Sequence, residues 1–298
     1  MSTSPSRKRF DWGLYYEALR VHLRYPLVLA GPLAAALVRG LSNHFLAWWF
    51  NERFRGGNET PNDLTYSLVQ VGASFVTAIV VSFCAAFAFI AADAAWSGEQ
   101  ISLGETRERL ELRLPEVTLV AIIVYVVAGA LGDISGYIQA RAVPLLGGQL
   151  GLPMILMSEA LLIAVTFFIV YALPAVSIGA VSGFGAATRG IRLAFANAGP
   201  TLLLAAVTQL PTMVTFPLSF QIFASVESLA NWLEYQGWLG LQHGAEFGIA
   251  GVVVSWLHVF IPALFGGYIA LVTVRTYEDL AASASAADAA VRDPGAPL

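Results

Sequence analysis

Six long apolar stretches occupy most of this 298-residue chain and limit what it can fold into. They begin near Pro26, Tyr66, Val117, Pro153, Pro200 and Phe247. A bilayer core of about 30 Å is crossed by roughly 20 mainly apolar residues in a helix, and each stretch reaches that length. Because lipid offers no partner for backbone N–H and C=O groups, such stretches fold as helices. The sequence therefore predicts an all-α fold, a polytopic transmembrane helical bundle of six spans.

The composition agrees with residence in a membrane. Hydrophobic residues make up 57% of the chain and charged residues 12%, and that charged share is about half that of a typical soluble domain. The chain lacks a basic run with interleaved aromatic residues, so nucleic acid is not expected as a partner. Membrane lipids are the expected partners, and other membrane protein subunits are a further option.

Arginine and lysine residues are distributed unevenly between the two sides of the predicted bundle. The N-terminus, every second loop and the C-terminus carry Arg7, Lys8, Arg9, Arg20, Arg24, Arg107, Arg109, Arg113, Arg189, Arg192, Arg275 and Arg292. The opposite loops carry Arg53, Arg55 and Arg141. Since loops rich in cations stay in the cytoplasm, we expect both termini there and the protein in a bacterial plasma (inner) membrane.

Three amphipathic stretches precede the first, third and fifth spans, and they can be aligned on Gly13, Gly104 and Gly185. Apolar residues stand one position before each glycine and six and ten positions after it. This spacing places them on one face of a helix. We therefore predict three cytoplasmic interfacial amphipathic helices, each leading into a transmembrane hairpin.

The chain divides accordingly into units of about residues 10–93, 100–181 and 182–280 within one transmembrane domain, 10–280. This regularity fits a threefold internal repeat, and it also fits the amphipathic entry segments that unrelated multi-pass proteins contain. The polar N-terminus, residues 1–9, and the C-terminal tail, residues 281–298, are expected to be disordered.

Polar residues inside the predicted spans are the candidates for a functional site, because such residues are costly in a membrane. They are Glu159 in the fourth span, His258 in the sixth, Arg39 in the first and Gln209 in the fifth. Pairing of Glu159 with His258 or Arg39 across the bundle would create a proton- or ion-handling site. The structural alternative is one hydrogen bond between helices, or snorkelling of a side chain toward the interface.

Motifs for catalysis and cofactor binding are not found. The chain has no phosphate-binding loop and no His-Glu-x-x-His motif, and its four histidines are scattered. The segments around Ser135 and Ser182 read Gly-x-x-Ser-Gly, which differs from the spacing of a serine nucleophile elbow. We therefore expect no enzyme activity, no cofactor and no metal.

One part of the chain resembles certain bacterial six-span membrane proteins. Leu173-Pro174-Ala175 ends a span, and Gly185-Ala-Ala-Thr-Arg189-Gly-Ile-Arg192-Leu193 forms a Gly-x-x-x-x-Arg stretch before the next hairpin. Ser102-Leu103-Gly104-Glu105 and Tyr25-Pro26 resemble the equivalent positions of the earlier units. The pattern is similar to that of the membrane domain fused to some glycerophosphodiester phosphodiesterases, and of its uncharacterised stand-alone relatives. The resemblance implies an architecture and no catalytic role.

The sequence thus leaves two functions open. The first is a non-enzymatic integral membrane protein, either an accessory or scaffold subunit of a membrane complex or a factor in envelope and lipid homeostasis. The alternative is a small transporter or channel with a polar path near Glu159 and His258. A transporter needs polar groups around a wet cavity, whereas a scaffold or lipid-binding protein tolerates a dry interior.

Overall fold

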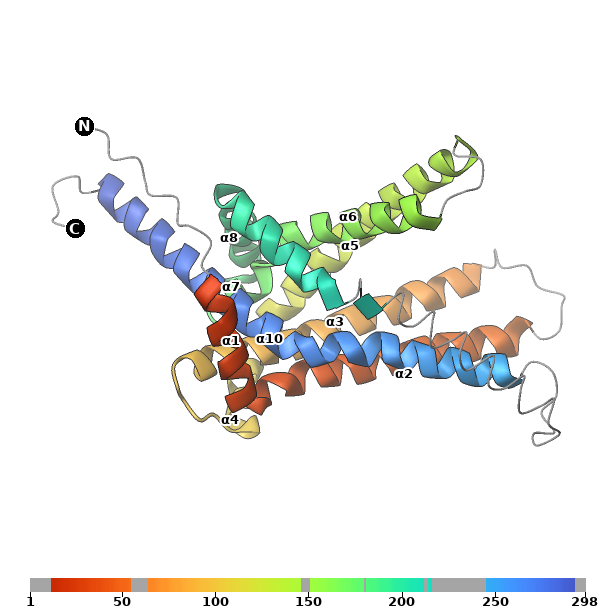
Figure 1. Ribbon diagram of the computed structural model, residues 1–298, viewed down its shortest axis with the longest axis horizontal. Helices are drawn as coiled ribbons and strands as arrows, with labels where there is room; N and C mark the ends of the chain where they lie inside the picture. Colours follow the sequence, from red (N-terminus) through yellow and green to blue (C-terminus); the bar gives the residue numbers. More distant parts are fainter. Residues whose placement is uncertain are drawn as a thin grey trace.

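The chain is almost entirely helical in the computed structural model, which describes residues 12–54, 64–145, 151–179, 181–211, 214–215 and 245–292 (Figure 1). The elements are α1 (Trp12–Arg24), η1 (Pro26–Leu29), α2 (Ala30–Phe54), α3 (Leu64–Trp96), α4 (Leu103–Glu111), α5 (Leu114–Leu145), α6 (Gly151–Ile169), α7 (Ala172–Ser177), α8 (Gly183–Ala196) and α10 (Ala245–Arg292). A further helix, Ala198–Pro211, follows α8. No strand occurs in these ranges, so the predicted all-α class is confirmed.

Four of the described helical segments are long and apolar enough to cross a membrane. They cover Pro26–Leu46, Leu68–Trp96, Ala160–Ser177 and Val259–Ala286. Up to two further spans are present if each of two bent helix pairs counts as one span. These pairs are α4 with the first part of α5, bent by 75°, and α8 with Ala198–Pro211, bent by 109°. The described chain therefore has four to six candidate spans, a range that includes the predicted six.

Polar side chains form hydrogen bonds at the start of the first bent pair and at the bend of the second. Ser102 Oγ accepts a 3.2 Å hydrogen bond from the backbone N–H of Glu105, and the Glu105 carboxylate accepts one of 2.7 Å from the Ser102 N–H. This capping box begins α4. At the second bend, Asn197 Nδ2 donates to the Leu193 carbonyl and Thr201 Oγ1 donates to the Asn197 carbonyl. Each of these carbonyls also accepts a backbone N–H, from Asn197 and Thr201 respectively, so the side chains add a second hydrogen bond on either side of the bend.

The fourth predicted span is broken into α6 and α7 by Pro174. Proline has no backbone N–H, and its ring clashes with the carbonyl four residues earlier, at Val170. Helix α6 accordingly ends at Ile169, and α7 begins two residues after Val170. Gly190 of α8 lies against this break, since a Cβ there would come within 2.9 Å of the Ala172 nitrogen. Helix α8 therefore crosses the chain where α6 stops.

The buried core lies at the end of the molecule where α1, α4, α7 and α8 gather (Figure 1). Its residues are mostly small, and they include Ala18, Ala86, Ala88, Ala91, Ala92, Ala95, Ala172, Ala175, Ala186, Ala194 and Ala270. Small side chains let helices approach closely in a membrane, where packing replaces the hydrophobic effect. Figure 1 shows α5 and α6 leaving this end together and diverging from α2, α3 and α10.

The described part of the C-terminal tail is helical. Residues 281–298 were expected to be disordered, yet α10 continues to Arg292. Alanine has the highest helix propensity and dominates this segment. Ser283 Oγ and Ser285 Oγ each donate to the carbonyl four residues earlier, so their hydroxyls are satisfied within the helix. The prediction for residues 1–9 lies outside the described residues.

Two of the three predicted interfacial segments expose apolar side chains along one side. On α1 these are Trp12, Tyr16, Leu19 and Leu23, and on α8 they are Phe184, Ile191 and Phe195. In the first and third units, the apolar residues one position before the aligned glycine and six and ten positions after it are therefore exposed. In the second unit Leu103 is exposed and Leu110 is half-buried, while Leu112 at the end of α4 is exposed.

Candidate functional site

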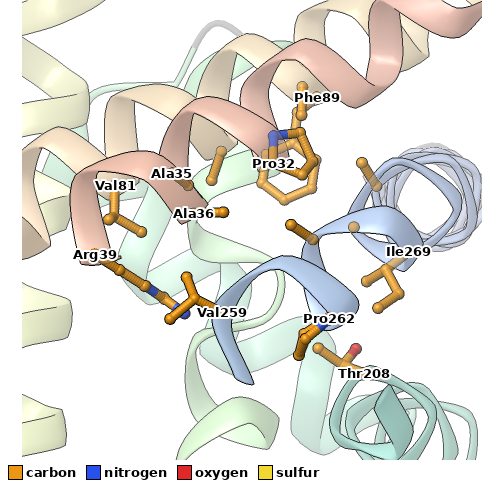
Figure 2. Close-up of a pocket in the computed structure, with 15 residues that line it drawn as sticks. Pro32, Ala35, Ala36, Arg39, Val81, Phe89, Thr208, Val259, Pro262 and Ile269 are labelled. Carbon is orange, nitrogen blue, oxygen red and sulfur yellow. The ribbon is translucent and has the colours of Figure 1, made fainter. Parts of the chain in front are cut away.

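A cavity of about 280 Å³ lies between α2, α3, α10 and the helix Ala198–Pro211 (Figure 2). It is lined by Pro32, Ala35, Ala36, Arg39, Val81, Ala85, Ala88, Phe89, Thr208, Val259, Pro262, Ala263, Gly266, Ile269 and Ala270. We call it the groove. Its wall is apolar apart from two side chains, and most of the lining residues are small.

Small residues explain why a space remains between helices that otherwise touch. Helices α2 and α10 meet at two points: Gly266 lies against Pro32, and Gly40 lies against the ring of Trp256. A Cβ on Gly266 would come within 2.6 Å of the Pro32 Cβ, and one on Gly40 would collide with the Trp256 ring. Between these contacts α2 presents Ala35, Ala36 and, next to Gly40, Arg39 to the groove, and the two alanines are too short to fill the gap.

The length of the groove follows from the helical rise. Pro32 lines one end and Arg39 the other. Seven residues of α-helix separate them, and at about 1.5 Å per residue the groove extends roughly 10 Å along α2. Its long direction thus follows the spans.

Among the described side chains Arg39 is the one cation on the groove wall, and Figure 2 shows it reaching from α2 toward Val259. Among the described residues no carboxylate lies within ion-pair distance of it. The second polar side chain, Thr208, already donates a 2.8 Å hydrogen bond to the Leu204 carbonyl of its own helix. The guanidinium is therefore the group in the groove that is left to bind a polar ligand.

Gln209, a predicted site residue, does not face the groove. Its Nε2 donates a 2.7 Å hydrogen bond to Thr166 Oγ1 of α6. Successive residues of a helix point about 100° apart, so Thr208 can line the groove while Gln209 faces α6. The structural alternative weighed in the sequence, one hydrogen bond between helices, describes Gln209.

Glu159 and His258 were the other predicted site residues. Glu159 belongs to α6 and His258 to α10, and both side chains lie outside the described residues. The predicted pairing of Glu159 with His258 or Arg39 therefore stays a prediction. In the described part of the chain, no group of three or more His, Cys, Asp or Glu side chains is placed to hold a metal ion.

The groove itself was missed in the sequence, although a signal was present. Pro32, Ala36 and Gly40 follow one another at intervals of four on α2. Ala263, Gly266 and Ala270 stand three and four apart on α10. Two helices with a small-residue face indicate close approach or a narrow space, but only their relative position decides which of the two forms.

Comparison of the chain with protein-family models, with curated proteins and with solved structures finds no match. The resemblance to the membrane domain of glycerophosphodiester phosphodiesterases therefore stays a prediction.

Proposed function

We propose that this chain is a non-enzymatic integral membrane protein of a bacterial plasma membrane that acts in lipid homeostasis. It binds an anionic amphiphile, with one acyl chain in the groove and the anionic group at Arg39. The observation that carries this proposal is an apolar groove whose described lining has a single cation, Arg39, at one end.

The size of the groove suits one alkyl chain. An engineered apolar cavity of about 150 Å³ holds a benzene molecule, and the groove has a volume of about 280 Å³. It is long and narrow because small residues of three helices line it on either side. A flexible single chain fills such a shape, whereas a rigid ring system or the paired chains of a whole phospholipid do not.

Arg39 selects the charge of the ligand. Arg39 is exposed on α2, so in a bilayer its guanidinium faces lipid as well as the groove. A guanidinium in such apolar surroundings is costly unless an anion pairs with it. Its planar fork binds a carboxylate or a phosphate through two parallel hydrogen bonds. An amphiphile with either group places that group at Arg39 and its chain along the groove toward Pro32.

The placement of the cations supports the proposed orientation in the membrane. Helices α1, α4 and α8 lie at one end of the molecule (Figure 1) and carry Arg20, Arg24, Arg107, Arg109, Arg189 and Arg192. Arg113 directly follows α4, and Arg275 of α10 lies over the ring of Trp96 at the end of α3. By the positive-inside rule this end faces the cytoplasm. The exposed apolar sides of α1 and α8 then lie in the cytoplasmic interface, as amphipathic helices do.

The contacts of the three leading helices support the proposed threefold repeat. Helix α4 packs on α3, the last span of the first unit, and α8 packs on α6 and α7, the end of the second. Helix α1 packs on α10, the last span of the third unit. Each leading helix thus contacts the end of the unit before it in a cyclic order, which is the arrangement that a threefold repeat produces.

Photocrosslinking tests the proposed ligand. Purified, delipidated protein is exposed to a fatty acid that carries a diazirine in its chain, or to the methyl ester of the same probe. We expect wild-type crosslinks on α2, α3 and α10, with the acid giving at least about tenfold more product than the ester. The variant Arg39→Gln should lose this preference, because without the guanidinium the groove binds the acid and the ester about equally.

A matched pair of neighbouring residues controls for the position of the probe. Ala263 lies in the groove and is 8% exposed, whereas Leu264 is 53% exposed on the outer side of α10. Ala263→Phe should fill the groove and remove the crosslinks, while Leu264→Phe should keep them. Thermal unfolding of both variants shows that they are folded. Equal crosslinking of folded Ala263→Phe and wild type would refute the proposal and favour an accessory-subunit role.

A further inference from the structure

A second cavity, of about 240 Å³, lies between α3, α7, α8 and α10 at the end where the leading helices gather. Asp93, Gly179, Arg189, Tyr277 and Glu278 line it. We call it the end pocket. Unlike the groove, it combines acidic and basic side chains with a phenol.

The hydroxyl of Tyr277 has no hydrogen-bond partner in the described structure. The side chain is 3% exposed, and a buried hydroxyl without a partner loses the hydrogen bonds that water would give it. Gly179 makes room for this hydroxyl, since a Cβ on Gly179 would collide with it. The fold therefore holds an unsatisfied donor and acceptor on the wall of a cavity.

One side of the end pocket is acidic. Asp93 of α3 and Glu278 of α10 both line it, and their carboxyl groups are neighbours. Two neighbouring carboxylates repel each other. Arg275 lies 3.6 Å from Glu278 and 3.9 Å from Asp279, and its guanidinium also faces the ring of Trp96. An ammonium group placed at the carboxyl pair would donate to both groups and offset the repulsion between them.

The other side is basic. Arg189 of α8 is half-buried, and in the described part of the chain no carboxylate lies within 4.0 Å of its guanidinium. It interacts electrostatically with the Tyr277 hydroxyl. A guanidinium and a phenol that converge in this way offer donors to the oxygens of a phosphate.

We propose that the end pocket binds a zwitterionic phosphoamine, with its ammonium at Asp93 and Glu278 and its phosphate at Arg189 and Tyr277. The group has two sources, an aminophospholipid headgroup and free phosphoethanolamine. The candidate span Leu68–Trp96 ends three residues after Asp93, which places the pocket at headgroup depth and favours the lipid. This inference does not depend on what occupies the groove.

Lipid binding by delipidated protein tests the proposal, measured by native mass spectrometry with phosphatidylethanolamine, phosphatidylcholine and phosphatidylglycerol. The first has a primary ammonium that donates hydrogen bonds, the second has a quaternary one that cannot, and the third has none. We expect phosphatidylethanolamine to bind at least about tenfold more tightly than the other two. Equal affinity for phosphatidylethanolamine and phosphatidylcholine would overturn the proposal.

Three variants locate the site. Asp93→Asn should abolish the preference for phosphatidylethanolamine over phosphatidylcholine, while Asp279→Asn, outside the pocket, should preserve it. Tyr277→Phe should weaken phosphatidylethanolamine binding about three- to tenfold while leaving the Tm unchanged or higher, because the lost hydroxyl has no partner in the protein. A lowered Tm with unchanged lipid affinity would assign Tyr277 a structural role and overturn the proposal.

Competition with soluble phosphoethanolamine identifies the source of the group. Displacement of the lipid at similar affinity supports the phosphoamine site and assigns it to a soluble ligand. Retention of the lipid at millimolar competitor supports the site and assigns it to the membrane. The failure of Arg39→Gln to alter either result separates this site from the groove.

Discussion

The indole Nε1 of Trp96 donates a 2.9 Å hydrogen bond to the backbone carbonyl of Leu271, joining residues 175 positions apart. Trp96 is the last residue of α3, and Leu271 lies fully buried in α10. The bond therefore fixes the end of one span against the middle of another, next to the end pocket. Nothing in the local sequence around Trp96 indicates this partner.

Replacement of Trp96 should destabilise the fold. Trp96→Phe keeps an aromatic ring and removes the donor, so we expect the free energy of unfolding to fall by about 1 kcal/mol. Tyr125→Phe is the matched control, because the Tyr125 hydroxyl also donates to a carbonyl of another helix, but at 3.3 Å and in an exposed position. Thermal unfolding in detergent should show a clearly larger loss for Trp96→Phe. Equal losses would mean that the Trp96 bond is not important for stability.

Replacement by alanine should destabilise the fold at Gly31 and should not destabilise it at Gly72, two glycines within candidate spans. A Cβ on Gly31 would collide with the backbone carbonyl of Cys84 and come within 3.0 Å of the Ala88 Cβ, whereas one on Gly72 would meet nothing within 4 Å. Backbone cannot move aside as a flexible side chain can, so Gly31→Ala should cost about 1–3 kcal/mol. Gly72→Ala should cost nothing, because alanine is the better helix former.

Thermal unfolding of the two variants beside wild type measures this difference. A stable Gly31→Ala variant would show that α2 and α3 are not as close at this point as the structure places them. The pair also separates packing from helix propensity, which the same substitution changes at both positions.

The helices and their order were predictable because bilayer length and backbone hydrogen bonding leave few choices. The first span, which begins with η1 (Pro26–Leu29) and continues in α2, and the leading helices α1, α4 and α8 follow from local patterns of apolar residues. The prolines show that the local sequence does not determine by itself where a helix ends. Pro174 ends α6, whereas Pro262 lies inside the continuous helix α10. The difference depends on neighbours, since α8 packs on the break before Pro174 through Gly190.

The sites were less predictable than the helices. Arg39 was selected as a candidate from the sequence, because a charge inside an apolar span is visible there. Its surroundings were not, since the groove forms from alanines and glycines on three helices. The end pocket pairs Asp93 with Glu278, which lie on the first and last units of the chain. Only the packing of α3 against α10 brings these carboxyl groups together.

Acid should destabilise the contact between α1 and α10 through His22. The side chain is half-buried, its Nδ1 has no partner in the described structure, and burial lowers its pKa below the usual 6.5. The unfolded chain therefore takes up the proton first as the pH falls through about 6.5, and this favours unfolding. The stability contributed by neutral His22 is complete above that pH and is lost progressively as the pH falls from there to the folded-state pKa.

Unfolding temperatures at pH 7.5 and pH 5.5 check this expectation. The decrease in Tm between the two pH values should be smaller for His22→Gln than for wild type. His44→Gln, at an exposed histidine of α2, should leave the wild-type decrease unchanged. If His22→Gln retained the full decrease, other groups would account for the acid sensitivity.

The exposed apolar side of α1 should lie in lipid. Cys84 is the one cysteine of the chain, so a Cys84→Ala background lets a single introduced cysteine carry a fluorophore. A label at Leu19→Cys should be quenched by lipids with a nitroxide near the headgroup, because Leu19 lies on the exposed apolar side of α1. A label at Glu17→Cys should be quenched more weakly by lipid and more strongly by aqueous iodide, since position 17 lies about 200° around the helix from position 19. Equal quenching at the two positions would place α1 away from the interface and leave its apolar side to a protein partner.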